Sequence, residues 1–175
     1  MKLALGTAQF GLNYGIANKH GQTPLHEVKA ILQTARNSGI AVLDTAALYG
    51  TSEQVLGKAG VELFQIVTKL PPIPENIDNV SEWAQETVKE SLRNLKRYSV
   101  YAVLLHRPLQ LMEKSGPELF DALQSLRAEG WFSKIGLSVY APSELEQILP
   151  YYTVDLVQAP LNVIDQRLIS SGWLI

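Results

Sequence analysis

The chain has 175 residues, of which 46% are hydrophobic and 18% are charged, as is typical of a single globular domain spanning 1–175. Its formal net charge of −2 gives no electrostatic reason to expect nucleic acid or an anionic membrane as a partner. The absence of cysteine excludes disulfides and thiolate chemistry, and the 3 histidines are too scattered to suggest a metal site. No stretch has the apolar length of a signal peptide or a membrane span, so we expect a cytoplasmic protein.

Patterns typical of strands and helices alternate along the chain. A short strand at 3–5 is followed by a long glycine-containing loop to residue 22, and Thr23 and Pro24 then open a helix that ends at Gly39. The remaining predicted strands cover 40–46, 65–70, 100–106, 133–140 and 154–161. The remaining predicted helices begin near 53, 81, 118 and 142. Such alternation predicts parallel strands joined by right-handed helical crossovers.

Two architectures fit this alternation, an open doubly wound sheet and a closed barrel. The doubly wound sheet expects a Gly-x-Gly-x-x-Gly turn after its first strand, whereas the sequence GTAQFG at 6–11 lacks the middle glycine. Polar residues also follow or end most predicted strands, and in a barrel they would converge on one mouth. These residues are Thr7, Asp44, Lys69, His106, Ser138 and Gln158. We therefore expect an α/β fold of the (β/α)8 TIM-barrel type.

The predicted barrel is incomplete. A complete barrel has eight strand–helix units and ~250 residues, whereas this chain has six predicted strands and stops where the next helix should begin. We therefore expect the amino-terminal portion of a longer enzyme, with the carboxyl-terminal units missing through truncation, cleavage or shortening. The unpaired edges of such a barrel would favour self-association of the chain.

The stretch 39–57 carries the most unusual pattern in the sequence. Its apolar strand ends on Asp44, Tyr49 follows five residues later in a turn, and Ser52 is placed to cap the next helix. An ionisable residue at the carboxyl end of a buried strand is unusual on packing grounds alone. In a strand–loop–helix protein, that end of the sheet is where ligands bind. We therefore expect Asp44 and Tyr49 to belong to a functional site.

Three neighbouring predicted strands end on an acid, a lysine and a histidine, namely Asp44, Lys69 and His106. Each has a structural explanation when taken alone: Asp44 could neutralise Lys69, His106 could bond to nearby backbone, and Tyr49 could pack on its helix. Neighbouring strands lie ~4.8 Å apart, so all four side chains can meet at one point. Their joint occurrence favours a catalytic cluster over four separate structural roles.

The chemistry of this cluster is that of a general acid. A lysine ammonium beside a phenol stabilises the phenolate, so we expect Lys69 to lower the pKa of Tyr49, and Asp44 to keep Lys69 charged. Tyr49 could then protonate a carbonyl oxygen that gains negative charge, while neutral His106 orients the substrate. The cluster contains no metal ligand set and no nucleophile–base pair. The reductant must therefore be a cofactor.

A series of short motifs extends along the whole chain: LGT at 5–7, LDTAALYG at 43–50, SEQVLGKA at 52–59, VTK at 67–69, ESLRNL at 90–95, LLHRP at 104–108, KIGLSVY at 134–140 and VQAPLN at 157–162. In their order and spacing, these motifs resemble the aldo-keto reductase family. The resemblance implies a barrel enzyme that reduces aldehydes or ketones with a nicotinamide cofactor, usually NADPH, with NADH possible. It also implies that Asp44, Tyr49, Lys69 and His106 form the catalytic tetrad, with Tyr49 as proton donor.

The resemblance also implies a cofactor site at the same mouth. It places Ser138 and Gln158 on the nicotinamide carboxamide, and Gly6 and Thr7 near the nicotinamide ring and ribose. The chain departs from the family at Val139, where an asparagine is common, so one carboxamide hydrogen bond has to be missing or supplied by another group. Two aromatic residues of the first loop, Phe10 and Tyr14, are candidates to line the substrate pocket, although aromatic residues in loops more often serve packing alone.

The family's remaining cofactor contacts lie in a carboxyl-terminal part that this chain does not contain. We therefore expect the chain alone to be inactive or impaired as a reductase. One alternative is a non-catalytic, reductase-like binding subunit. A weaker one makes Lys69 a Schiff-base nucleophile in a barrel lyase, although a neighbouring carboxylate such as Asp44 keeps a lysine protonated.

Overall fold

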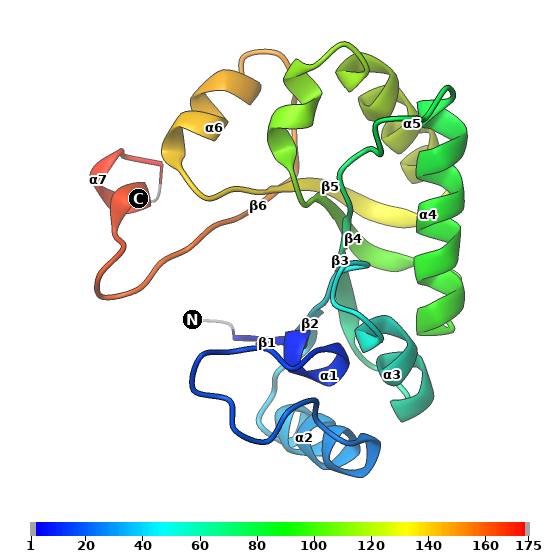
Figure 1. Ribbon diagram of the computed structural model, residues 1–175, viewed down its shortest axis with the longest axis vertical. Coiled ribbons are helices and arrows are strands. Elements are labelled where there is room, and N and C mark those ends of the chain that lie inside the picture. The colour runs from blue at the N-terminus through cyan, green and yellow to red at the C-terminus, as the bar shows by residue number, and fades with distance from the viewer. Residues whose placement is uncertain (1–2, 174–175) are drawn as a thin grey trace.

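The computed structural model describes residues 3–173 as a curled sheet of six parallel strands (Figure 1). The strands are β1 (Ala4–Gly6), β2 (Val42–Asp44), β3 (Gln65–Leu70), β4 (Val100–Leu105), β5 (Phe132–Ser138) and β6 (Leu156–Gln158). Each strand pairs with the next one in the chain, so the sheet order is β1-β2-β3-β4-β5-β6. This arrangement confirms the expected fold, an incomplete (β/α) barrel.

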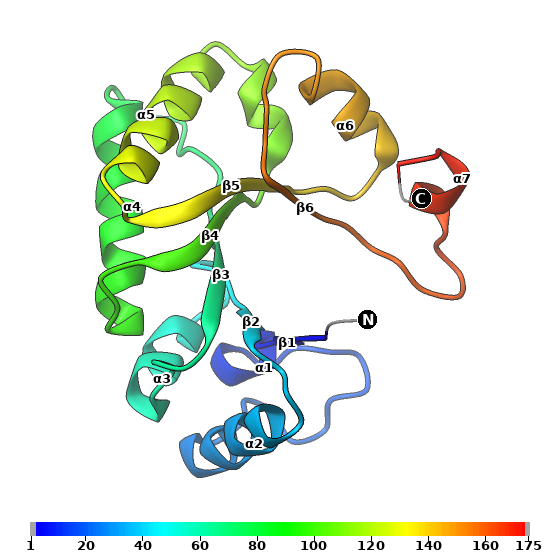
Figure 2. The ribbon, with the colours of Figure 1, turned by 180° about the vertical axis from the view of Figure 1, so that it is seen from behind.

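Helices cover the convex side of the curled sheet (Figures 1 and 2). They are α1 (Ala8–Gly11), α2 (Leu25–Asn37), α3 (Ser52–Ala59), α4 (Val80–Leu95), the 3₁₀ helix η1 (Pro108–Met112), α5 (Gly116–Ala128) and α6 (Pro142–Ile148). The short helix α7 (Arg167–Ser170) lies beyond β6, away from the sheet. The five expected helices are confirmed as α2 to α6. The short elements α1, η1 and α7 were not expected, because four or five residues are too few to show a helical period. Within 3–173, no helix combines the length and the apolar character that crossing a membrane requires.

The second strand is shorter than its apolar pattern predicts. Ile40 was expected to begin this strand, but its N–H donates to the carbonyl of Ala35 at 2.9 Å and so helps to end α2. The turn is made by Gly39, whose φ of 75° lies in the left-handed region that glycine tolerates. An apolar residue that directly follows a helix can therefore belong to the end of that helix and not to the next strand.

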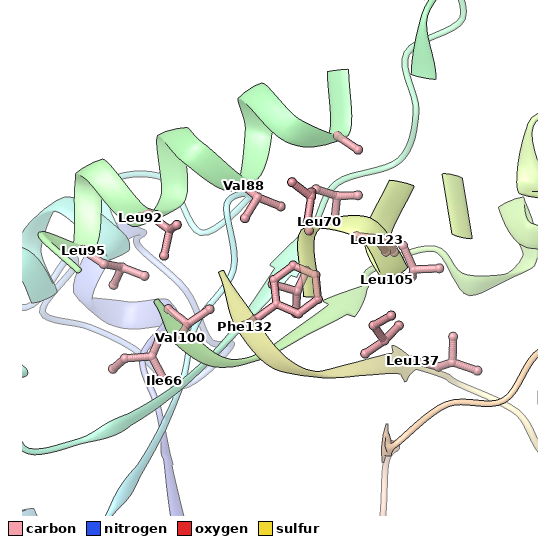
Figure 3. Close-up of a cluster of buried hydrophobic side chains, with 14 of the residues drawn as sticks. Ile66, Leu70, Val88, Leu92, Leu95, Val100, Leu105, Leu123, Phe132 and Leu137 are labelled. Atoms are coloured by element: carbon pink, nitrogen blue, oxygen red, sulfur yellow. The ribbon is translucent and has the colours of Figure 1, made fainter. Parts of the chain in front are cut away.

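The main hydrophobic core lies between the convex face of the sheet and the helices. Figure 3 shows this packing, in which the side chains of β3, β4 and β5 meet those of α4 and α5. The labelled residues are Ile66, Leu70, Val88, Leu92, Leu95, Val100, Leu105, Leu123, Phe132 and Leu137. All ten are buried, so on this face of the sheet these side chains serve packing against the helices.

The concave face carries a second, smaller cluster formed by Val67, Ala102 and Leu104. Successive side chains of a strand point to opposite faces, so residues two positions further along share the face of the first. Lys69 follows Val67 and His106 follows Leu104 at this spacing. Both therefore belong to the concave face, at the carboxyl end of the strands.

Candidate active site

The strand register gathers the predicted site residues at one end of the sheet. Asp44 is paired with Gly6 on one side and with Val67 on the other. Ser138 is paired with Gln158, each as the last residue of its strand. Because all six strands are parallel, these residues share the carboxyl-terminal edge where a barrel has its mouth.

Lys69 is the centre of the site. Its side chain is only 1% exposed, and its ammonium donates to Asp44 Oδ1 at 2.7 Å, to the carbonyl of Thr45 at 2.9 Å and to the hydroxyl of Tyr49 at 3.4 Å. All three ammonium protons therefore have acceptors. Burial lowers the pKa of Lys69, and the Asp44 carboxylate opposes that shift. The structure thus brings Asp44, Tyr49 and Lys69 into direct contact.

The pKa of Tyr49 differs from the expectation. Burial, followed by the negative charge of Asp44, raises the pKa of this phenol to about 12, so the net shift is opposite to the lowering that was expected from the neighbouring Lys69 ammonium. The ammonium lies 4.9 Å from the centre of the Tyr49 ring, but its charge is already compensated by the shorter contact with Asp44. Tyr49 therefore keeps its proton at neutral pH.

His106 completes the cluster. Its ring lies edge-on to that of Tyr49, with 5.9 Å between the ring centres and an angle of 85° between the ring planes. Burial and the charge of Lys69 lower the pKa of His106, so the imidazole is neutral at neutral pH. Its Nδ1 atom is buried and has no hydrogen-bond partner among residues 3–173. Because a buried N–H without an acceptor is costly, the single proton is favoured on Nε2.

A pocket of about 250 Å³ joins the cluster to the predicted carboxamide ligands. Its lining includes Tyr49, His106, Ser138, Tyr140 and Gln158. Larger hollows exist on the outer surface, such as one of about 480 Å³ beside the loop before α2, but none of these five residues lines it. In this pocket, two side chains predicted for catalysis, Tyr49 and His106, thus meet two predicted for cofactor binding, Ser138 and Gln158.

The residues that were predicted to belong to the site from the end of β1 and the loop after it differ in their exposure and in their contacts. Gly6 is exposed, and a Cβ added there would meet no atom within 4 Å, so the mouth is open beside it. Thr7 is fully buried, and its hydroxyl donates to the carbonyl of Asp44 at 2.9 Å. Phe10 is 4% exposed and belongs to the outer core, so the suggestion that it lines the substrate pocket is wrong. Tyr14 is 60% exposed and lies near enough to Tyr49 to affect its pKa.

Two features of the site were missed from the sequence. Tyr140 lines the pocket, and its place two residues after Ser138 at the end of a strand was the available signal. Ser52 was expected to cap α3, but the helix begins at this residue and its hydroxyl donates instead to the carbonyl of Thr7 at 2.9 Å. No local pattern distinguishes a serine that caps a helix from one that bonds to a distant strand end.

Comparisons with known proteins identify the family. The model of the Aldo/keto reductase family matches residues 2–173, so the chain belongs to this family. It is 31% identical over 158 residues to the NAD/NADP-dependent indole-3-acetaldehyde reductase of Schizosaccharomyces pombe, a match that covers 86% of this chain and 50% of that protein. It is 26% identical to the uncharacterized oxidoreductase YcsN of Bacillus subtilis, over 75% of this chain and 49% of that protein. The chain therefore spans about half the length of the curated relatives it matches.

Solved structures show the same relationship. A candidate aldo-keto reductase from Pseudomonas aeruginosa matches with a TM-score of 0.78 and 27% identity, over 95% of this chain and 66% of that chain. The holo form of an aldo-keto reductase from Bacillus halodurans matches with a TM-score of 0.78 and 22% identity, over 99% of this chain and 58% of that chain. At 22% identity, the match to the Bacillus halodurans structure supports the fold alone, and it agrees with the incomplete barrel seen here.

Proposed function

We propose that this chain carries the acid–base part of the active site of an NAD(P)H-dependent reductase of aldehydes or ketones. The observation that carries the proposal is the contact of the Lys69 ammonium with both Asp44 and Tyr49, beside a pocket that His106 shares. Membership of the aldo/keto reductase family supports this activity. A relative named as an NAD/NADP-dependent aldehyde reductase supports it further.

The residues at the mouth fit a nicotinamide cofactor, with NADPH preferred and NADH as the alternative. The hydroxyl of Ser138 and the amide of Gln158 lie on paired strand ends and line the same pocket. Together they offer donors and an acceptor, which suits the amide group of a nicotinamide. The open space beside Gly6 leaves room for the ring. When bound, the reduced nicotinamide supplies a hydride to the carbonyl carbon of the substrate.

Tyr49 supplies the proton that accompanies the hydride. As the carbonyl oxygen gains negative charge, the phenol donates its proton to that oxygen, and the product is an alcohol. An alkoxide is a stronger base than a phenolate, so a phenol with a pKa of about 12 is still acidic enough for this transfer. The Lys69 ammonium stabilises the phenolate that remains, and solvent returns the proton. His106, with its proton on Nε2, can donate a hydrogen bond to the same oxygen.

Replacement of Tyr49 by phenylalanine tests this assignment. In a version of the protein extended past Ile175 to the length of its relatives, we expect Tyr49→Phe to lower turnover of an aldehyde panel with NADPH by about 100-fold or more, because the acid is lost, and to leave NADPH affinity nearly unchanged. Tyr98→Phe is the matched control, since Tyr98 is fully exposed before β4. Retained turnover in Tyr49→Phe would remove Tyr49 as the acid.

The same assays separate the alternatives. NADPH binding without turnover of any carbonyl by the unsubstituted protein, including a version extended past Ile175 to the length of its relatives, would favour the non-catalytic binding subunit. Borohydride trapping of a carbonyl compound on Lys69 would favour the lyase. The 2.7 Å contact between Lys69 and Asp44 speaks against the lyase, because a carboxylate at this distance disfavours the neutral amine that a Schiff base needs.

A further inference from the structure

Three buried hydroxyl groups meet behind the Lys69 site, where the ends of β1 and β2 reach the start of α3. They belong to Thr7, Thr45 and Ser52, and each of these residues has 0% of its surface exposed. The Ser52 hydroxyl lies 3.0 Å from that of Thr7 and accepts from that of Thr45 at 3.1 Å. We refer to these three side chains as the hydroxyl cluster. They lie too deep to bind a ligand themselves.

The hydroxyl cluster is bonded to the backbone as well. Thr7 donates to the carbonyl of Asp44 at 2.9 Å, and Ser52 donates to the carbonyl of Thr7 at 2.9 Å. The three hydroxyl protons make three hydrogen bonds, from Thr7 to the Asp44 carbonyl, from Ser52 to the Thr7 carbonyl and from Thr45 to Ser52. Ser52 is thus the centre of the cluster, and its loss would leave the buried Thr45 hydroxyl without its acceptor and remove one of the two donors to the Thr7 carbonyl.

These bonds hold the backbone that surrounds Lys69. The carbonyl of Asp44 accepts from both the N–H and the hydroxyl of Thr7, each at 2.9 Å. The carbonyl of Thr45 is one of the three acceptors of the Lys69 ammonium. The Ser52 N–H donates to the carbonyl of Tyr49 at 3.0 Å. The hydroxyl cluster thus bonds to the backbone of Asp44 and includes the side chain of Thr45, while the bond to the Tyr49 turn comes from the backbone of Ser52. Asp44, Thr45 and Tyr49 together supply the three acceptors of the ammonium.

We propose that the hydroxyl cluster is a positioning device that fixes the Lys69 ammonium between Asp44, the Thr45 carbonyl and Tyr49, with Ser52 as its central residue. Its effect on catalysis rests on the proposed function, whereas its effect on the ammonium does not. Small apolar side chains would fill the same space without needing partners, since a buried hydroxyl is costly unless it is bonded. The hydroxyl groups instead bond to residues that supply acceptors to Lys69, through the carbonyl of Asp44 and the side chain of Thr45.

A buried hydroxyl on the opposite face of β3 provides a matched comparison. Thr68 is the residue before Lys69, is 2% exposed, and donates to the Glu53 carboxylate at 2.6 Å. Its side chain points to the convex face, away from the ammonium. Replacing Thr68 by valine therefore removes a buried hydroxyl one residue from Lys69 without touching the hydroxyl cluster.

The experiment follows the Lys69 ammonium directly by NMR of 15N-labelled lysine side chains in the purified protein. A buried ammonium with three acceptors exchanges its protons slowly and gives an observable signal, which Lys69→Met assigns. We expect Ser52→Ala and Thr45→Val to broaden or abolish this signal, and Thr45→Ser, which retains the hydroxyl, to keep it. Thr68→Val should also keep it. With NADPH and an aldehyde, Ser52→Ala and Thr45→Val should lower kcat about 10- to 100-fold with little change in KM for NADPH.

The outcomes distinguish the two proposals. An unchanged Lys69 signal in Ser52→Ala and Thr45→Val, an equal loss in Thr68→Val, or no slowly exchanging signal in the unsubstituted protein would each overturn the positioning role. If Ser52→Ala does not fold, Thr45→Val carries the test, because valine keeps the shape of threonine. A signal lost in Ser52→Ala and Thr45→Val, in a protein that reduces no carbonyl even when it is extended past Ile175 to the length of its relatives, would overturn the proposed function and leave the positioning role standing.

Discussion

Lys69 shows how a single buried charge is tolerated inside this fold. Its ammonium has three acceptors, and one of them, Asp44, is charged and only 18% exposed. Burial of a charge is costly unless it is paired and fully hydrogen-bonded, and here both conditions are met. The same pairing serves structure and chemistry, so the structural and catalytic explanations of the Asp44–Lys69 pair do not exclude each other.

Removing the charge of Asp44 should therefore destabilise the protein. We expect Asp44→Asn to lower the free energy of unfolding by about 3 kcal/mol, because the buried Lys69 ammonium loses its counterion. The control is Glu86→Gln, which breaks the ion pair of Glu86 with Lys89, whose side chains are 59% and 51% exposed. That pair should contribute less than about 1 kcal/mol. Urea unfolding of both variants makes the comparison, and equal losses would contradict the role of burial.

The raised pKa of Tyr49 predicts different pH profiles for the two reaction directions. Reduction needs the protonated phenol, which persists up to a pKa of about 12, so its kcat should not fall between pH 7 and about pH 10 through loss of this proton. Alcohol oxidation needs the phenolate, so its kcat should rise with pH through the same range. Measuring kcat in both directions against pH tests this prediction. A reduction rate that halves near neutral pH would contradict it.

At the scale of elements, the turn that holds Tyr49 packs closely against α1 because glycines stand at the two points of contact, Gly11 and Gly50. A Cβ on Gly11 would lie 1.9 Å from the carbonyl oxygen of Tyr49 and 2.2 Å from the nitrogen of Ser52. Gly50, the residue after Tyr49, has a φ of 59°, and a Cβ there would lie 2.4 Å from the carbonyl oxygen of Gly11. Neither position has room for a side chain, so the two backbones fix the place of the phenol.

Gly11→Ala tests this close packing. We expect a loss of about 1–3 kcal/mol in the free energy of unfolding and a lower kcat, because the Tyr49 turn has to move away from the added methyl group. Gly130→Ala is the control, since Gly130 has a φ of 85° but no neighbour within 4 Å of an added Cβ. It should lose stability through backbone strain alone and keep the kcat of the unsubstituted protein. Thermal unfolding and steady-state kinetics separate the two effects.

The elements show what the sequence could and could not predict. The strand at Gln65–Leu70 was predicted to the residue, because prolines stop its apolar run. Asp44, Lys69 and His106 were predicted to share one mouth, because the ends of parallel strands are fixed by topology. The role of Ser52 and the pKa of Tyr49 depend on burial and on distant partners, which no local pattern encodes. The burial of Phe10 in the outer core also depends on contacts with distant residues, so it could not be predicted from the local sequence.

On the scale of the whole molecule, the curled sheet has two unpaired edges within residues 3–173, at β1 and β6. Exposed apolar side chains accompany the second edge, with Val157 at 39% exposure on β6 itself and Ile164 at 92% in the loop that follows. Edge strands of this kind offer free backbone donors and acceptors to other chains. The chain is therefore suited to pair with further polypeptide at this edge.

Self-association of the 175-residue chain through this edge can be measured by sedimentation against concentration. We expect association that Val157→Lys reduces, because a charge on an edge strand opposes pairing with a second copy. Tyr98→Lys adds the same charge at a fully exposed position before β4, away from both edges, and should leave association unchanged. Equal association of the two variants would show that the contact between copies does not involve β6.

The order of the strands also bears on how the protein folds during synthesis. Every strand pairs with its immediate neighbours in the chain, so each new unit can dock on units that the ribosome has already released. Contacts that are local in sequence form faster than contacts between distant segments. The partners of Lys69 all precede it in the chain, and His106 arrives with the next strand. The acid–base cluster can therefore assemble in the nascent chain before β5 and β6 have emerged from the ribosome.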